Sequence, residues 1–311
     1  MNLSNGQTYL AIPGPSVIPE AVLRAMHRIS PNIYEGELID LTHTLIPDLR
    51  YVAQTDSNVA LYIANGHGAW EAALANMACH SDRVLVAATG WFAHGWAKMA
   101  RAMEIHADIV GYGTQSTVDL DALETALRAH PSDYYKAVLV THVDTSTSVK
   151  NDIAAVRALL NDLGSHALLA VDCVASLGCD EFKMDAWGAD VMVAACQKGL
   201  MVPAGMAFVY FNDKAAERQK QLPYVSSYWE WGQRANPEIL AHYFCGTAPT
   251  HHLYGLRIAL DMIRAEGIEK IWTRHETLAK AIWAAVECWG ADGPMRMNIQ
   301  DKSLRSTAVT A

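Results

Sequence analysis

Between residues 58 and 212, short apolar runs alternate with amphipathic segments. The runs are six to eight residues long and rich in Val, Ala and Leu, which is typical of buried strands. Segments 118–130 and 151–164 predict helices, the second with Asn151 and Asp152 as caps and Gly164 at its end. This alternation predicts an α/β fold whose parallel or mostly parallel sheet is covered by helices on both faces. The six predicted strands are 59–64, 83–89, 136–143, 167–174, 191–196 and 206–211.

The pattern changes after residue 212. Leu253, Leu256, Leu260 and Ile263 recur at helical spacing and predict one amphipathic helix. Segment 269–290 predicts a second helix. Residues 301–311 alternate between polar and apolar, which predicts the beginning of a further strand.

Composition narrows the class of protein. The chain has 311 residues, 51% of them hydrophobic, and 24 basic against 33 acidic residues give a net charge of −9. Without a basic cluster, nucleic acid and anionic membrane are poor candidate partners.

The six cysteines form no CxxC pair and sit mostly in apolar runs, so we expect buried free thiols in a reducing compartment. No apolar stretch approaches a membrane span and the first residues lack signal-peptide features, which predicts a cytoplasmic protein.

Ligands of parallel sheets bind at the carboxyl ends of the strands, so the residues after each predicted strand are the candidates for chemistry. After the first run, Asn65, Gly66, His67 and Gly68 lead into a helix, where backbone N–H groups are free to hold a phosphate. The motif is not a dinucleotide fingerprint, because its third glycine would fall at Glu71. Taken alone, a plain turn into a helix is the simpler reading.

The other strand ends carry a ring, hydroxyl groups, a carboxylate and an amine. Phe92 follows the second run, and Thr145 begins a hydroxyl-rich turn after the third. Asp172 closes the apolar part of the fourth run, where a carboxylate is costly unless it meets a cation or several donors. Lys198 follows the fifth run in a segment that is otherwise apolar or small. Singly, core packing, helix capping or an exposed strand end explains each of them.

Together, these groups match one ligand. Pyridoxal phosphate (PLP) has a phosphate, a flat pyridine ring, a phenolic oxygen, a ring nitrogen that must stay protonated, and an aldehyde that condenses with an amine. An ordinary lysine, with a pKa near ~10.4, is too protonated to attack an aldehyde efficiently, whereas burial among apolar neighbours favours the free amine. The apolar surroundings of Lys198 therefore fit a lysine that binds PLP.

Six motifs extend this interpretation over nearly the whole chain: "IPGPSVIPEAVLRAM", "GHGAWEAAL", "THVDTSTSV", "AVDCVASLG", "MDAWGADVMVAACQKGLMVPAG" and "GTAPTHHLYGLRIAL". The set resembles the class V, fold-type I aminotransferases, in particular the serine/alanine:glyoxylate transaminase group. The resemblance implies PLP fold-type I, with a mostly parallel sheet sandwiched by helices. It implies an N-terminal arm and substrate loop over 1–20, a large PLP-binding domain over 21–265, and the start of a truncated small α+β domain over 266–311.

The resemblance also implies an activity and residue roles. The activity is transfer of an amino group from alanine or serine to a 2-oxo acid such as glyoxylate, by a ping-pong mechanism in a homodimer that shares its active site. Lys198 would condense with the cofactor and move the substrate proton, and Asp172 would keep the pyridine nitrogen protonated. The other positions contact cofactor or substrate. They are Phe92 and Val174 on the two ring faces, Gly66, His67, Gly68 and Gln197 at the phosphate, Thr145 near the ring, Thr247 at the neighbouring subunit's phosphate, and Pro13, Gly14 and Tyr34 at the substrate.

Three departures from the family pattern bear on activity. Phe244 stands where relatives often have a tyrosine that touches the partner's phosphate, and segment 32–38 lacks the commoner His/Arg pair of this loop. The small domain is nearly absent, and with it the arginine that clamps the substrate carboxylate. A shortened enzyme of this kind is expected to bind its cofactor better than it turns over substrate.

Three other functions remain open from the residues. The same scaffold supports lyases and cysteine desulfurases, but desulfurases usually carry a histidine where Gln197 stands. A non-catalytic remnant that acts as an oligomer partner would explain the truncation. A metal hydrolase is disfavoured, because Ala279 replaces the second histidine of HExxH in segment 275–279 and the adjacent His251 and His252 do not share a helical face.

Overall fold

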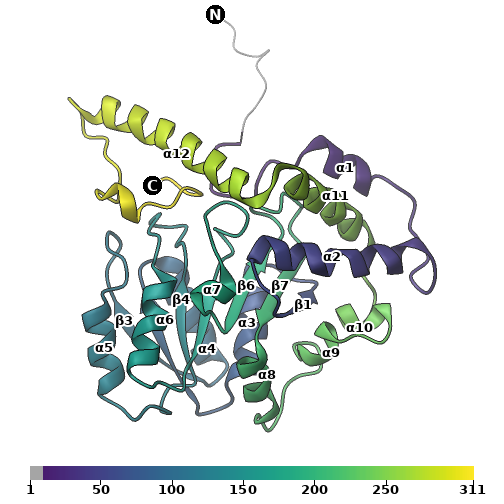
Figure 1. Ribbon diagram of the computed structural model, residues 1–311, viewed down its shortest axis with the longest axis horizontal. Coiled ribbons are helices and arrows are strands. Elements are labelled where there is room, and N and C mark those ends of the chain that lie inside the picture. Colours follow the sequence, from purple (N-terminus) through teal and green to yellow (C-terminus); the bar gives the residue numbers. More distant parts are fainter. Residues whose placement is uncertain (1–9) are drawn as a thin grey trace, which may run out of the picture.

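A seven-stranded sheet lies at the centre of the structure (Figure 1), a computed structural model that describes residues 10–311. The strand order is β1-β7-β6-β5-β4-β2-β3, and only β7 runs against its neighbours. The prediction of a mostly parallel sheet is confirmed. The strands are β1 (Asn58–Tyr62), β2 (Arg83–Ala88), β3 (His106–Gly111), β4 (Ala137–Thr141), β5 (Leu168–Asp172), β6 (Val191–Ala195) and β7 (Ala207–Phe211).

Helices cover both faces of the sheet, as the apolar strands predict. One face packs against α2, α5, α6, α7 and α11, and the other packs against α3, α4 and α8. Side-chain caps start several of these helices, since Asp119, Asp152 and Asn212 each accept a backbone N–H two or three residues onward. The helices are α1 (Glu20–Met26), α2 (Glu37–Ala53), α3 (Gly66–Met77), α4 (Trp91–Ala102), α5 (Leu120–Arg128), α6 (Ile153–Asp162), α7 (Met184–Trp187), α8 (Asp213–Lys220), α9 (Gly232–Ala235), α10 (Leu240–Phe244), α11 (Thr250–Glu266) and α12 (Ile268–Gly290).

The strand order places the candidate groups together. Strands β4, β5 and β6 are neighbours and parallel, so the loops that follow them emerge at the same edge of the sheet. Thr145 and Lys198 lie in the loops after β4 and β6, and Asp172 is the last residue of β5. The order of strands along the sheet therefore assembles residues that are far apart in the sequence.

Several sequence-based expectations were wrong in detail. The edge strand β3 was not predicted, because "HADIVG" has no continuous apolar run and only Ala107 in it is buried. The predicted strand over 301–311 is instead a short 3-10 helix (Lys302–Leu304) and an irregular segment that contributes one isolated bridge, Arg305 to Val149. Asp152 caps α6 as predicted, whereas Asn151 bonds Thr89 and the carbonyl of Thr141.

The helices before β1 and helix α11, which follows β7 later in the chain, meet on one side of the sheet. Helices α1 and α2 pack against α11, which buries Leu253, Leu256, Leu260 and Ile263 as the helical spacing predicted.

Residues 1–9 of the predicted N-terminal arm lie outside the described residues. None of the helices in residues 10–311 has the length and hydropathy needed to cross a membrane. All six cysteines are unpaired, but only three are fully buried, fewer than the apolar runs suggested.

The segment after α12 returns to the body of the fold. The carboxylate of Asp180, which is buried, accepts hydrogen bonds from Ser306 Oγ (2.5 Å), Thr307 N (3.0 Å) and Ala308 N (3.2 Å). Val309 then packs against Val143 and Ala175. Buried hydrogen bonds to a charged group thus fix this segment beside the strand ends.

Candidate active site

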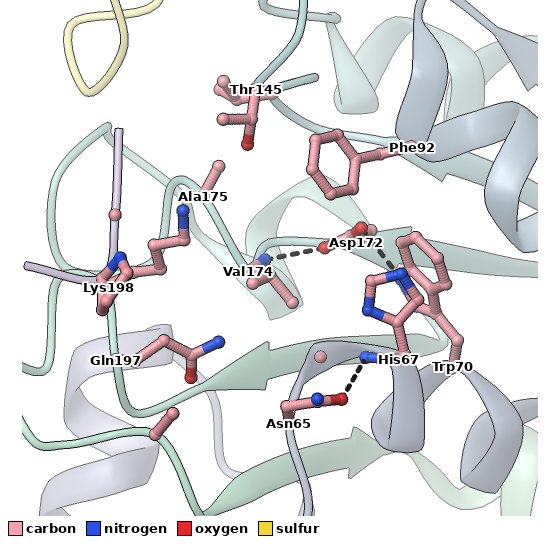
Figure 2. A pocket seen from close by; sticks show the side chains of 15 residues that line it. Asn65, His67, Trp70, Phe92, Thr145, Asp172, Val174, Ala175, Gln197 and Lys198 are labelled. Carbon is pink, nitrogen blue, oxygen red and sulfur yellow. Dashed lines mark hydrogen bonds between the residues drawn. The ribbon is translucent and has the colours of Figure 1, made fainter. Parts of the chain in front are cut away.

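A cavity of about 280 Å³ opens at the carboxyl ends of β4, β5 and β6, close to the lower end of the volume range of ligand sites. Figure 2 shows its side chains, and the lining residues come from the ends of five strands, β1, β2, β4, β5 and β6, and from the N-terminal segment. It brings together nine of the residues singled out from the sequence. They are Gly14, Gly66, His67, Phe92, Thr145, Asp172, Val174, Gln197 and Lys198.

Asp172 is the last residue of β5 and is only 4% exposed. Its Oδ1 accepts the N–H of Val174 (2.7 Å), and its Oδ2 accepts the indole N–H of Trp70 (2.9 Å), as Figure 2 shows. Burial raises the pKa of Asp172 to about 7; these two hydrogen bonds oppose the rise, the Asp144 carboxylate adds to it, and the Lys198 ammonium lowers it. A cationic group on a ligand would therefore stabilise the ionised form of this buried carboxylate.

Lys198 enters the same cavity from the loop after β6, and Figure 2 shows Val174 between Lys198 and Asp172. Burial lowers the pKa of Lys198 from its ordinary value, opposed by the charge of Asp172. The following residue must be small, since a Cβ at Gly199 would lie 2.2 Å from the carbonyl oxygen of Leu177. This close approach sets the lysine loop against the loop that follows Asp172.

The N-terminal segment closes one side of the cavity. The Lys198 ammonium donates to the carbonyl of Pro13 (2.6 Å), and Ser16 bonds the carbonyls of Gln197 and Lys198, both at 2.8 Å. Gly14 has φ +135°, and a Cβ there would lie 2.4 Å from Lys198 Nζ. Pro13 and Gly14, which the sequence assigned to substrate, thus lie directly against the lysine.

The start of α3 forms another wall. Asn65 caps this helix, and its Oδ1 accepts the N–H groups of His67 (3.0 Å) and Gly68 (3.3 Å). The amides predicted to hold a phosphate are therefore bonded to the cap in this structure. Gly66 and His67 line the cavity, but Gly68 does not. Across from them, Gln197 has a buried Oε1 with no partner among the described residues.

Phe92 forms the aromatic wall, and Asp144 holds its backbone. Asp144 is buried, and its Oδ2 accepts the N–H groups of Phe92 (3.0 Å) and Ala93 (3.3 Å) at the start of α4. Its Oδ1 accepts the N–H (3.0 Å) and hydroxyl (2.6 Å) of Ser146. One carboxylate therefore ties the loop after β2 to the hydroxyl-rich turn after β4.

Two predicted residues lie elsewhere. Thr247 is exposed and Tyr34 is 86% exposed, and neither lines this cavity. Tyr34 contributes to a separate apolar depression between the α1–α2 connection, α2 and α10, together with Ile239. The described lining residues of the candidate cavity include no arginine.

Sequence reasoning missed Trp70, Asp144 and the capping role of Asn65. Asp144 carries the same signal as Asp172, a carboxylate at the end of an apolar run. Trp70 lies four residues after Gly66, one helical turn into α3, so helical spacing places it beside the cavity. A search one turn into the helix after the glycine motif would have found it.

Comparison with known proteins agrees with this geometry. The family described as class-V aminotransferases matches residues 8–289. Serine–glyoxylate aminotransferase of Arabidopsis thaliana is 36% identical over 307 residues, which cover 98% of this chain and 76% of that protein. Serine–glyoxylate aminotransferase of Methylorubrum extorquens is 37% identical over 293 residues, covering 92% and 72%, respectively.

Solved structures show the same fold. The crystal structure of an alanine–glyoxylate aminotransferase from Nostoc sp. superposes with a TM-score of 0.86 at 27% identity. The alignment covers 99% of this chain and 82% of that one. The alignment thus spans the sheet and the segments that line the cavity in this chain.

Proposed function

We propose a function from the premise that this chain belongs to the class-V aminotransferase family. It transfers an amino group from a small amino acid, alanine or serine, to a 2-oxo acid such as glyoxylate, with PLP as cofactor. The observation that carries the proposal is the pairing, in one cavity, of a buried carboxylate, Asp172, with a half-buried lysine, Lys198.

The residues of the cavity fit PLP. A ring between Phe92 and Val174 would place its nitrogen toward Asp172. The buried amide oxygen of Gln197, which has no partner among the described residues, makes another part of the cavity wall polar. A Cβ at Gly66 would lie 2.9 Å from Val174, so glycine leaves room between these walls. Gly66, His67, Gly68 and Gln197 are proposed to hold the phosphate, with His67 and Gly68 exchanging the Asn65 cap for it.

When bound, PLP supplies an aldehyde that condenses with amines and a ring that accepts electrons from the substrate. The contribution of Asp172 is a negative charge at a fixed position beside the ring nitrogen. With a pKa raised to about 7, its carboxylate is ionised more completely when a cation lies beside it. Asp172 would therefore favour a protonated ring nitrogen on the bound cofactor.

The contribution of Lys198 is an amine that carries a proton within the cavity. Burial lowers its pKa, so the neutral Nζ that attacks an aldehyde, or removes a proton from a substrate carbon, is more populated than in water. The carbonyl of Pro13 accepts a hydrogen bond from this Nζ and orients it. Thr145, with Phe92, lines the ring side of the cavity.

The assembly is proposed from the same family membership. The active unit is a homodimer in which the exposed Thr247 contacts the phosphate bound by the neighbouring subunit, and Tyr34, Pro13 and Gly14 contact substrate. By the same proposal, residues up to 20 belong to an arm, 21–265 to the cofactor-binding domain, and residues from 266 onward to a second domain. Six unpaired cysteines support a reducing compartment, the cytoplasm.

The test is the visible absorbance of the purified protein titrated with PLP. The parent is expected to develop the band of lysine-bound PLP, and Lys198→Ala is expected to lose it. Lys214→Ala is the matched control, because Lys214 is also half buried with a lowered pKa but contacts Asp190 and the carbonyl of Ala167, away from the cavity. A folded parent without the band, or the same loss in Lys214→Ala, refutes the assignment.

A further inference from the structure

The carboxylate of Asp172 has a fixed aromatic donor. Trp70 is 2% exposed, and its indole Nε1–H lies 2.9 Å from Asp172 Oδ2. The indole is packed on three sides, by the stacked ring of Trp96 at 6.0 Å, by Phe92 at 6.2 Å and by His67 at 4.5 Å between ring centroids. This packing leaves the N–H directed at the carboxylate.

An indole N–H differs chemically from the other groups around Asp172. It only donates, and it does not titrate near neutral pH, so it stabilises the ionised carboxylate at every working pH. The charged groups that face Asp172 act in both directions, since Asp144 disfavours its ionisation and Lys198 favours it. His67 lines the same cavity and the thiol of Cys173 follows Asp172 in the chain.

The two donors also fix the orientation of the carboxylate. Val174 N–H occupies one lone pair of Oδ1 and Trp70 Nε1–H occupies one lone pair of Oδ2. Each oxygen retains a further acceptor site, and Asp172 lines the cavity. The two donors therefore fix both oxygens of the carboxylate and leave an acceptor site on each for a ligand.

Resting on the proposed function, we propose that Trp70 is a positioning residue for the cofactor. Its indole N–H holds Asp172 ionised and oriented, so that the carboxylate can accept a hydrogen bond from the ring nitrogen of PLP. Val174 N–H also favours the ionised carboxylate but belongs to the backbone, whereas Trp70 donates from a side chain that substitution can remove.

A purely structural role for Trp70 is the rival explanation, and the chain offers a matched control. Trp96 is fully buried and stacked on Trp70, but its own Nε1 has no hydrogen-bond partner among the described residues. Trp70→Phe and Trp96→Phe remove the same atoms from the same aromatic cluster. Only the first removes a hydrogen bond to Asp172.

The first readout uses the protein without cofactor. Burial already raises the pKa of Asp172, so its ionisation lowers the free energy of unfolding as pH rises from the ordinary carboxyl range toward about 7. Trp70→Phe raises this pKa further, so the decline should extend to higher pH. Trp96→Phe should follow the parent profile. Urea unfolding measured from pH 5 to 9 gives the comparison.

The second readout is the dissociation constant for PLP, from absorbance titration at neutral pH. Loss of one hydrogen bond to a charged group is expected to weaken binding about tenfold or more in Trp70→Phe. Trp96→Phe is expected to bind like the parent. If the two variants behave alike in both readouts, the indole N–H does not act through Asp172 and the proposal is overturned.

A third measurement keeps the proposal testable if Trp70→Phe does not fold. In the parent labelled with 15N-tryptophan, one indole N–H resonance should shift with pH as Asp172 titrates, and Asp172→Asn should abolish that titration. A parent in which no indole resonance titrates overturns the proposal. A parent that shows the coupling but binds no PLP refutes the proposed function and the cofactor role of Trp70, while the Trp70–Asp172 interaction itself stands.

Discussion

Adding a single methyl group at Gly14 tests whether the N-terminal segment positions the lysine. An alanine Cβ at this position would lie 2.4 Å from Lys198 Nζ, 2.5 Å from Cδ and 2.7 Å from Cε. Ordinary van der Waals contacts of a Cβ lie at 3.4–4 Å, so the two groups must separate by roughly 1 Å. The clash involves three consecutive atoms of the lysine, so the end of its side chain must move as a unit.

The magnitude follows from this displacement. Misplacement of a reacting group by 1 Å costs about 10²-fold in rate, and we expect a loss of that order in kcat/KM for transamination by Gly14→Ala. The φ of +135° adds backbone strain of about 1–3 kcal/mol, which an alanine relieves only by moving the segment. The backbone strain lowers the free energy of unfolding, whereas the clash displaces the Lys198 amine and lowers the rate.

Gly267→Ala separates these two effects. Gly267, between α11 and α12, has φ +89°, and a Cβ there would meet no atom within 4 Å. Both variants should therefore lose stability in urea unfolding, but only Gly14→Ala should bind PLP weakly and react slowly. The absorbance titration and the rate with an amino acid and glyoxylate measure the difference. Equal activity of the two variants would show that the Pro13–Ser16 segment does not position Lys198.

Two further predictions concern buried carboxylates. Because the folded-state pKa of Asp172 lies near 7 and its ordinary value is 3.8, Asp172→Asn should gain stability over the parent as pH rises through this interval, by up to about 4 kcal/mol in cofactor-free protein. Equal differences in urea unfolding at pH 5 and pH 8 would contradict this. Burial opposes ionisation of Asp180, but His142, Lys150 and the hydrogen bonds from Ser306 and Thr307 together lower its pKa, so its stabilisation is present above the ordinary carboxyl pKa and is lost as pH falls through the lowered value. At pH 7, Asp180→Ala should make local opening at Ala308 easier by about 3 kcal/mol, and unchanged amide exchange there would exclude this anchoring role.

Periodicity and strand ends predicted the central fold well, because the parallel strands are buried on both faces and read as apolar runs. The same rule failed for β3, an edge strand whose exposed side chains weaken the apolar signal. It failed again over 301–311, where alternation reflects packing of single residues such as Val309 and hydrogen bonds to Asp180. Local pattern does not report such tertiary contacts.

Part of the candidate site could likewise be predicted from the sequence, and part could not. Asp172 and Lys198 were predictable, because a charged side chain at the end of an apolar run is costly without a partner. Helical spacing also places Trp70 beside the cavity, but its hydrogen bond to Asp172 was not predictable, since an apolar helical position carries no mark of it. The capture of the His67 and Gly68 amides by Asn65 depends on a side-chain conformation that composition leaves undetermined.

The contact between Val309 and the cavity wall sets an order of events during synthesis. Val143 and Ala175 line the cavity, and the residue that covers them follows Lys198 by more than a hundred positions. At the usual speed of translation, this stretch takes roughly 5–20 s to make. Throughout that interval the lysine exists in a nascent chain whose cavity wall lacks its outer support. Complete assembly of the cofactor pocket must therefore come after the sheet itself has been synthesised.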